Sequence, residues 1–208
     1  MRRAMGWLLA LVLGVGVFGA AQIYAENFET PSPPDLPSGW DSVDEEGLWK
    51  TVDKAQFSGE PAAVRNFPSG DQALYYGNVL PNGTGSYDTG ERTKGCVRTG
   101  DQPVEESGWY QVAFSYYRVV EEYAPGGYDK ATAYVVFQND QEEFLNPTTG
   151  EAGLSEPEAR KVIFYRDSSH ASSTEWQEFV SDPFQAPTGA SQVYVAVSYT
   201  HLTLPTKR

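Results

Sequence analysis

Proline and glycine interrupt the chain so often that no long helix fits after its N-terminal segment. The 208 residues include 14 prolines and 20 glycines, and an interior proline breaks a helix because it lacks the N–H donor and clashes with the preceding turn. Between these breaks, short runs alternate with the period of a strand. The clearest run is residues 110–119, where Val112, Phe114 and Tyr116 share one face.

Several other runs have the length and composition of strands, and aromatic residues make up 13% of the chain. Aromatic and β-branched side chains suit a half-buried pleated surface. The expected strands are residues 48–52, 72–76, 131–137, 161–166, 175–180 and 192–196. Turn-rich segments separate them and no repeat is visible, so the sequence predicts an all-β, antiparallel jelly-roll β-sandwich over residues 26–196.

The N-terminal segment, residues 1–25, has the pattern of an export signal. Arg2 and Arg3 form a basic start, residues 7–18 are apolar, and cleavage fits after Ala21 or Ala25. The apolar run of residues 4–25 is also long enough to span a bilayer, so an uncleaved anchor is the alternative. Either reading predicts a secreted or cell-surface protein.

The C-terminal segment, residues 197–208, resembles a translated sequencing-library adaptor more than natural protein. We expect the natural protein sequence to end its match to this chain near Ala196, with translated adaptor after it. We also expect the original gene to continue past this point. His201, one of two histidines, therefore carries no predicted function. A catalytic domain on the missing part of the chain is one possible partner of this module.

The net charge of −13 narrows the range of ligands. Such a field repels phosphate backbones, so nucleic acid is an unfavourable partner. It attracts cations, of which calcium is the obvious candidate because it prefers oxygen ligands; the simpler reading of the charge is solubility alone. Cys96, the only cysteine, is expected to be a small buried apolar residue.

The order of several short motifs indicates a family. Asn-Phe-Glu at residues 27–29 is followed by Gly-Trp at 39–40, Leu-Trp at 48–49, Ala-Leu-Tyr-Tyr-Gly-Asn at 73–78 and Tyr-Asp-Lys at 128–130. This order resembles the MAM-like jelly-roll domains of secreted bacterial proteins, including those appended to immune-inhibitor-A-type peptidases. The resemblance implies an adhesive or ligand-binding module, a structural Ca²⁺ with Glu29 and Asp129 among its ligands, and a final strand lost with the truncation.

Catalytic patterns are weak. His170 lies in a polar segment, residues 167–173, without a nucleophile elbow, and one histidine plus one cysteine cannot build a zinc site. Carboxylate pairs stand at residues 105–106, 121–122 and 142–143, but adjacent residues of a strand face opposite ways. A glycosidase-like sandwich enzyme using two of these acids stays open as an alternative, as does a structural cell-surface domain.

Aromatic side chains are the best sequence candidates for ligand contact. Most of them must fill the core, but Tyr123 and Tyr128 flank the short loop 124–127 and are expected to be exposed. The favoured hypothesis is therefore a non-catalytic extracellular binding, adhesion or accessory module with a glycan or a protein as its partner.

Overall fold

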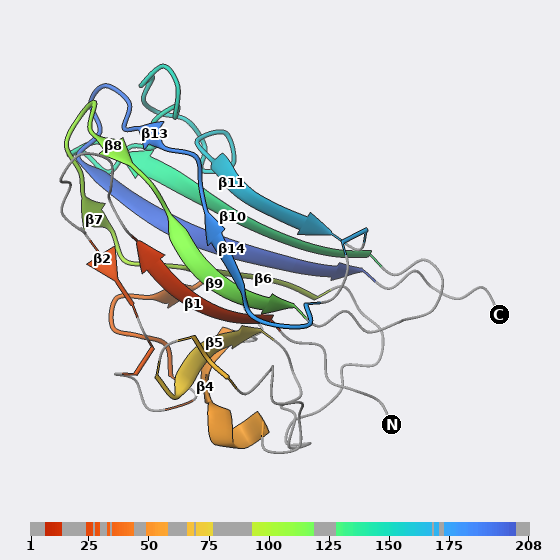
Figure 1. Cartoon of the computed structure of the whole chain (residues 1–208). Helices are drawn as coiled ribbons and strands as arrows, with labels where there is room; N and C mark the ends of the chain where they lie inside the picture. The colour runs from red at the N-terminus through yellow and green to blue at the C-terminus, as the bar shows by residue number, and fades with distance from the viewer. Residues whose placement is uncertain are drawn as a thin grey trace.

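The computed structural model describes residues 7–13, 24–26, 28–29, 33, 35–43, 49–57, 66–68, 70–76, 93–118, 128–167, 169–170 and 173–202. These residues form two large antiparallel sheets, one two-stranded sheet and one 3-10 turn, η1 (Lys54–Phe57) (Figure 1). The prediction of an all-β antiparallel sandwich is confirmed. Within the described residues no helix is long and apolar enough to cross a membrane.

The strands of the first sheet, sheet A, follow the order β12 (Gln177–Val180), β9 (Ala113–Arg118), β1 (Trp7–Leu13), β5 (Gln72–Tyr76) and β4 (Trp49–Asp53), with β2 (Tyr24–Ala25) paired to β1. Sheet B follows the order β11 (Lys161–Asp167), β10 (Tyr128–Gln138), β14 (Gln192–Leu202), β6 (Thr93–Arg98) and β3 (Asp41–Ser42), with β7 (Gln102–Pro103) paired to β14. The small sheet joins β8 (Trp109–Tyr110) to β13 (Phe184–Gln185).

The main core lies between sheets A and B and is built by strand alternation. Phe114 and Tyr116 point from β9 toward Phe164 of β11, with ring centroids 5.2 Å and 5.0 Å away. Tyr76 of β5 packs on Tyr199 of β14 at 4.6 Å. These edge-to-face and tilted contacts are favoured by the ring quadrupoles, and they tie the two sheets together along their length.

The outer face of sheet A is also covered. Tyr75 and Tyr117 alternate away from the main core and pack with Phe57 of η1, and Phe67 and Trp176 complete the cluster. Sheet A is therefore buried on both faces near β5 and β9, which explains why four of the five residues of β5 are buried.

Strand β1 comes from the segment predicted as an export signal. It pairs antiparallel with β9 from Trp7↔Arg118 to Val12↔Ala113 and with β5 from Trp7↔Tyr76 to Leu9↔Leu74. The structure thus places the apolar run at the centre of sheet A. Whether the segment is cleaved stays a prediction, but cleavage at Ala21 or Ala25 would remove the strand that joins β5 to β9.

Strand β14 continues through the adaptor-like residues. Val197 and Tyr199 are buried in the main core, and the pairing with β10 runs on to Tyr128↔Leu202. The expected domain limit at Ala196 therefore falls inside a strand. This placement leaves the origin of residues 197–208 as a prediction.

Candidate functional site

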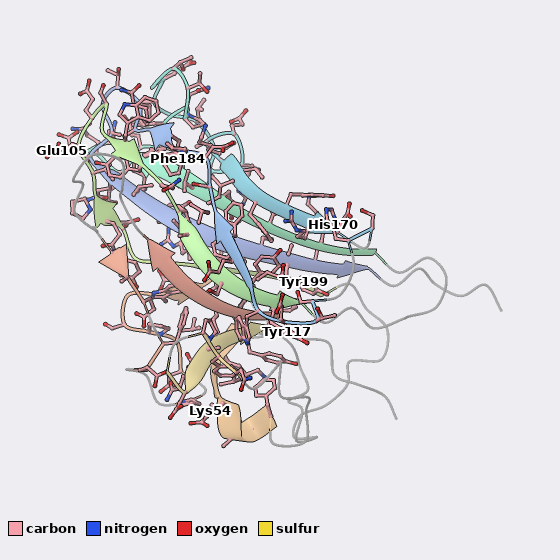
Figure 2. The ribbon with its side chains drawn as sticks, in the orientation of Figure 1. Lys54, Glu105, Tyr117, His170, Phe184 and Tyr199 are labelled. Atoms are coloured by element: carbon pink, nitrogen blue, oxygen red, sulfur yellow. The ribbon has the colours of Figure 1, made fainter. Side chains whose placement is uncertain are left out.

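Glu29, the first predicted calcium ligand, serves as a clamp on a turn. Its Oε1 accepts hydrogen bonds from the backbone N–H groups of Asp71 and Gln72 at 2.6 and 2.7 Å. The turn needs Gly70, whose φ is +61° and whose position a Cβ could not share with the Glu29 carboxylate. Lys54, labelled in Figure 2, forms an ion pair with Asp71 next to this clamp, so one ammonium group already compensates part of the negative charge here.

Asp129, the second predicted ligand, lies toward the other end of the sandwich. It pairs with His201 on β14, beyond the level where Tyr199 meets Tyr76. Glu29 binds the amide of Gln72, four residues or about 13 Å of strand before Tyr76. The role of Glu29 and Asp129 as calcium ligands stays a prediction; the described residues include no group of three or more metal-binding side chains.

Of the two predicted ligand contacts, Tyr123 and Tyr128, the structure describes only the backbone of Tyr128. Tyr123 lies outside the described residues, and the backbone of Tyr128 opens β10 opposite Leu202. Their role in ligand binding stays a prediction.

His170 has neighbours that superficially resemble a hydrolytic triad. Its Nδ1 lies 3.0 Å from Asp167 Oδ1 and 3.4 Å from Ser169 Oγ. A proton relay requires the nucleophile and the acid on opposite ring nitrogens, whereas here both approach the same one. Ser169 instead donates to Asp167 at 2.5 Å, and these hydrogen bonds hold the pKa of Asp167 well below its ordinary value. The cluster is a tight turn after β11.

Two of the three carboxylate pairs lie in exposed turns. Glu105 and Glu106 are exposed in the turn before β8, while Glu142 and Glu143 are exposed in the turn after β10. Glu143 accepts a hydrogen bond from Asn139 at 2.8 Å, and Glu142 has a φ of +62°. The third pair, residues 121–122, lies outside the described residues. A cavity of about 10 Å³, enough for one water molecule, lies between the sheets beside Phe114 and Phe164.

Trp109 is an exposed aromatic side chain that the sequence analysis did not single out. Its relative exposure is 60%, although the neighbouring Tyr110 is 9% exposed. The reason is strand alternation: Trp109↔Gln185 and Tyr110↔Phe184 are the two pairs of the β8–β13 sheet. One pair faces the core, where Phe184 meets Phe137 at 6.2 Å, and the other faces solvent.

The backbone under Trp109 is held by a dense set of hydrogen bonds. Ser107, with a φ of +61°, donates its N–H to Ala186 O at 3.1 Å, and Ala186 returns a bond to Gly108 O at 2.8 Å. The Glu105 N–H donates to the Tyr110 hydroxyl at 2.7 Å. A Cβ at Gly108 would lie 2.8 Å from that hydroxyl, so the turn requires glycine. Figure 2 shows Glu105 and Phe184 together at this end of the molecule.

We call Trp109 and Gln185, together with the turn that supports them, the Trp109 platform. It combines a flat apolar ring with amide and carboxylate groups on a backbone that is already ordered. An aromatic face with adjacent hydrogen-bonding groups suits a sugar ring or an apolar side chain of a protein. A preordered site also loses less conformational entropy when it binds.

Comparison with known proteins adds little. No protein-family model and no curated protein matches the sequence. Among solved structures, the K1 cleaved adhesin domain of Lys-gingipain from Porphyromonas gingivalis W83 aligns over 81% of this chain and 92% of its own, with 10% identity and a TM-score of 0.34. Similarity at this level carries no argument about fold or function, and the MAM-like resemblance stays a prediction.

Proposed function

We propose that this protein is a non-catalytic extracellular binding or adhesion module whose ligand, a glycan or a protein, contacts the Trp109 platform. The observation that carries the proposal is an indole ring 60% exposed on a backbone fixed by reciprocal hydrogen bonds. A large ring left in water costs free energy that burial against a ligand would recover. The ordered turn means that little further ordering is needed.

The export pattern of residues 1–25 supports the extracellular part of this proposal. Ser169 and Asp167 approach the same ring nitrogen of His170, which does not suit a proton relay and supports a binding role over a hydrolytic triad. The glycosidase-like alternative is separated by the test below. An accessory role beside a catalytic domain is compatible with the same site. Stabilisation by Ca²⁺, which the net charge of −13 favours, stays a separate prediction.

The test is a binding screen of the full chain against soluble xylan, mixed-linkage glucan, galactan and mannan, by affinity electrophoresis and then calorimetry. Trp109→Ala should weaken binding of any positive polymer by about tenfold or more, and Trp109→Phe by less, because the smaller ring buries less surface. Val180→Ala is the control, since Val180 is 56% exposed on β12.

Unchanged binding in Trp109→Ala would overturn the role of the platform. Hydrolysis of any of these polymers, abolished by changing Glu105 or Glu106 to glutamine, would overturn the non-catalytic assignment.

A further inference from the structure

Positive charge is concentrated on sheet B. Its strands carry five basic and three acidic residues, although the whole chain has 15 basic and 28 acidic residues. The basic residues are Lys94, Arg98, Lys130, Lys161 and Arg166, and the acids are Asp41, Asp129 and Asp167. Arg160, directly before β11, adds a sixth cation. Sheet B is thus the one sheet where cations outnumber acids.

Three tyrosines cross the outer face of sheet B on a diagonal. Tyr165 of β11 pairs with Thr132, two residues before Tyr134 of β10, and Tyr194 of β14 pairs with Val136, two residues after it. Diagonal neighbours on adjacent strands lie about 7–8 Å apart. Inward residues alternate with them and fill the main core, so the three rings belong to the face turned away from sheet A.

Each of these rings carries a cation. Arg160 lies over Tyr134 at 4.4 Å, Arg98 over Tyr194 at 5.0 Å and Lys130 over Tyr165 at 5.3 Å from the ring centroid. A cation over an aromatic face is attracted by the ring quadrupole. The rings therefore fix three positive groups in a row across the sheet.

Two of the three rings belong to a buried cluster with Val136, Ala159 and Ala196. The accessible groups of the diagonal are Arg98, Lys130 and Tyr165. Tyr134 and Tyr194 are each only 2% exposed, and Tyr134 reaches across the small Ala196 to place its hydroxyl 3.2 Å from Cys96 Sγ. Burial raises the pKa of both phenols above the ordinary tyrosine value, so neither ring becomes an anion that would cancel the cations.

The acids on this face differ in how firmly they hold the cations. Glu156 binds Arg160 through two hydrogen bonds of 2.9 and 2.5 Å, which makes that guanidinium part of the scaffold. Asp41 reaches Arg98 by one contact of 3.3 Å, and exposed ion pairs of this kind contribute little and exchange readily. Lys130 has no ion pair with any described residue. Asp167 is the cross-strand neighbour of Lys130, but its carboxylate accepts hydrogen bonds from Ser169 and from the Tyr165 hydroxyl. Arg98 and Lys130 are therefore the cations that an acidic ligand could reach.

We propose that this outer face of sheet B binds a carboxylate-bearing polysaccharide, a chain of uronic-acid sugars, through Arg98 and Lys130. Guanidinium groups match the planar carboxylate in a fork of hydrogen bonds. Tyr165, 38% exposed, offers a flat apolar contact for a sugar ring beside Lys130. This surface is separate from the Trp109 platform and does not depend on it.

A glycan fits this face better than the other polyanions. The backbone groups of β10 and β14 are used by the sheet along their whole pairing, so a peptide could not add main-chain hydrogen bonds here, as it does at a free edge. Nucleic acid carries a dense phosphate charge that the net charge of −13 repels. A single chain with one carboxylate per sugar has a lower charge density than duplex DNA, which carries two phosphates per base pair, and it suits two cations.

The experiment compares polygalacturonate with its fully methyl-esterified form, which has the same sugar chain without the charge. The full chain should bind the acid form, and rising salt should weaken that binding. The Arg98→Gln/Lys130→Gln double variant should lose about tenfold or more in affinity. Lys54→Gln, which removes a cation on the sheet A side, is the matched control and should bind like the parent.

Three outcomes would overturn the proposal: equal binding of the esterified polymer, no loss in the double variant, or equal loss in Lys54→Gln. Tighter binding of dextran sulfate, a polyanion without uronic acid, or of a thymidine oligonucleotide would also overturn it in favour of general polyanion attraction. If the double variant does not fold, the affinity of Lys130→Gln alone, a change at a partly exposed side chain, is measured instead and should be lower than that of the parent. Trp109→Ala should leave this binding unchanged, so failure here and failure of the proposed function are distinguishable.

Discussion

Sheets A and B are held together in different ways. In sheet B the two longest strands, β10 and β14, pair over 11 residues from Tyr128↔Leu202 to Gln138↔Gln192. In sheet A the central strand is β1, and β5 reaches β9 only through it. The central strand of sheet B, β14, comes from the end of the predicted domain and the segment that follows it. The central strand of sheet A, β1, comes from the predicted export signal.

This difference shows where the stability of the fold depends on processing. An unpaired strand edge exposes backbone donors and acceptors and invites association with other chains. Loss of β1 would create two such edges, on β5 and β9, in a sheet that is buried on both faces. Sheet B has no such dependence. The four predictions that follow test this contrast, beginning with the largest effect.

Deleting residues 1–25 should damage sheet A far more than sheet B. We expect the Tm to fall by more than about 10 °C, since each kcal/mol corresponds to about 2–4 °C in a domain of this size, and aggregation to increase. Amide exchange should accelerate at Leu74 and Tyr116 more than at Val135 and Val195. Deleting only residues 1–6 retains β1 and is the control. Equal protection of both sheets in the long deletion would contradict the central role of β1.

Phe114→Ala should weaken the junction between the sheets. Phe114 belongs to sheet A and contacts Phe164 of sheet B at 5.2 Å and Phe179 at 4.8 Å. Truncating a buried phenylalanine leaves a cavity and costs about 3–5 kcal/mol, which denaturant unfolding would measure. Val180→Ala, at an exposed position of β12, should change stability by less than about 0.5 kcal/mol. Similar losses in both variants would mean that the two sheets are not coupled through this ring.

Glu29→Ala should have a moderate effect at the edge of sheet A. The Asp71 and Gln72 amides would lose their shared acceptor, at a cost of about 1–3 kcal/mol, while Glu29→Gln keeps a carbonyl acceptor and should lose less. The difference in Tm between parent and variant should be the same whether melting is measured with calcium or with chelator. A calcium-dependent gain in Tm that disappears in Glu29→Gln would instead support the predicted metal site.

Ser169→Ala should have the smallest effect, at the end of β11 in sheet B. Hydrogen bonds from Ser169 are the main cause of the lowered pKa of Asp167, so the variant should raise that pKa toward its ordinary value in an NMR titration. A lowered folded-state pKa stabilises the protein above the unfolded pKa of about 4. That stabilisation disappears as the pH falls toward the folded value. An unchanged titration would show that Ser169 does not hold the carboxylate.

Much of the sheet structure was readable from local patterns. The expected strand 72–76 coincides with β5, and the alternation of Val112, Phe114 and Tyr116 does place them in the main core. Strand β6 was missed because Thr-Lys-Gly-Cys-Val-Arg has a glycine, two cations and no alternation. Its strand conformation comes from pairing with β14 and β3, and such long-range pairing leaves no local signal.

The candidate surfaces were harder to read than the fold. The sequence by itself determined that the chain is all-β, acidic and rich in aromatic residues, because composition and period-two alternation are local properties. It did not determine whether Trp109 or Tyr110 is exposed. Strand alternation places the two side chains on opposite faces but does not say which face is exposed to solvent. Only the tertiary structure decided that, by packing Tyr110 beside Phe184, and only strand order brought Arg98, Lys130 and Arg160 onto one face.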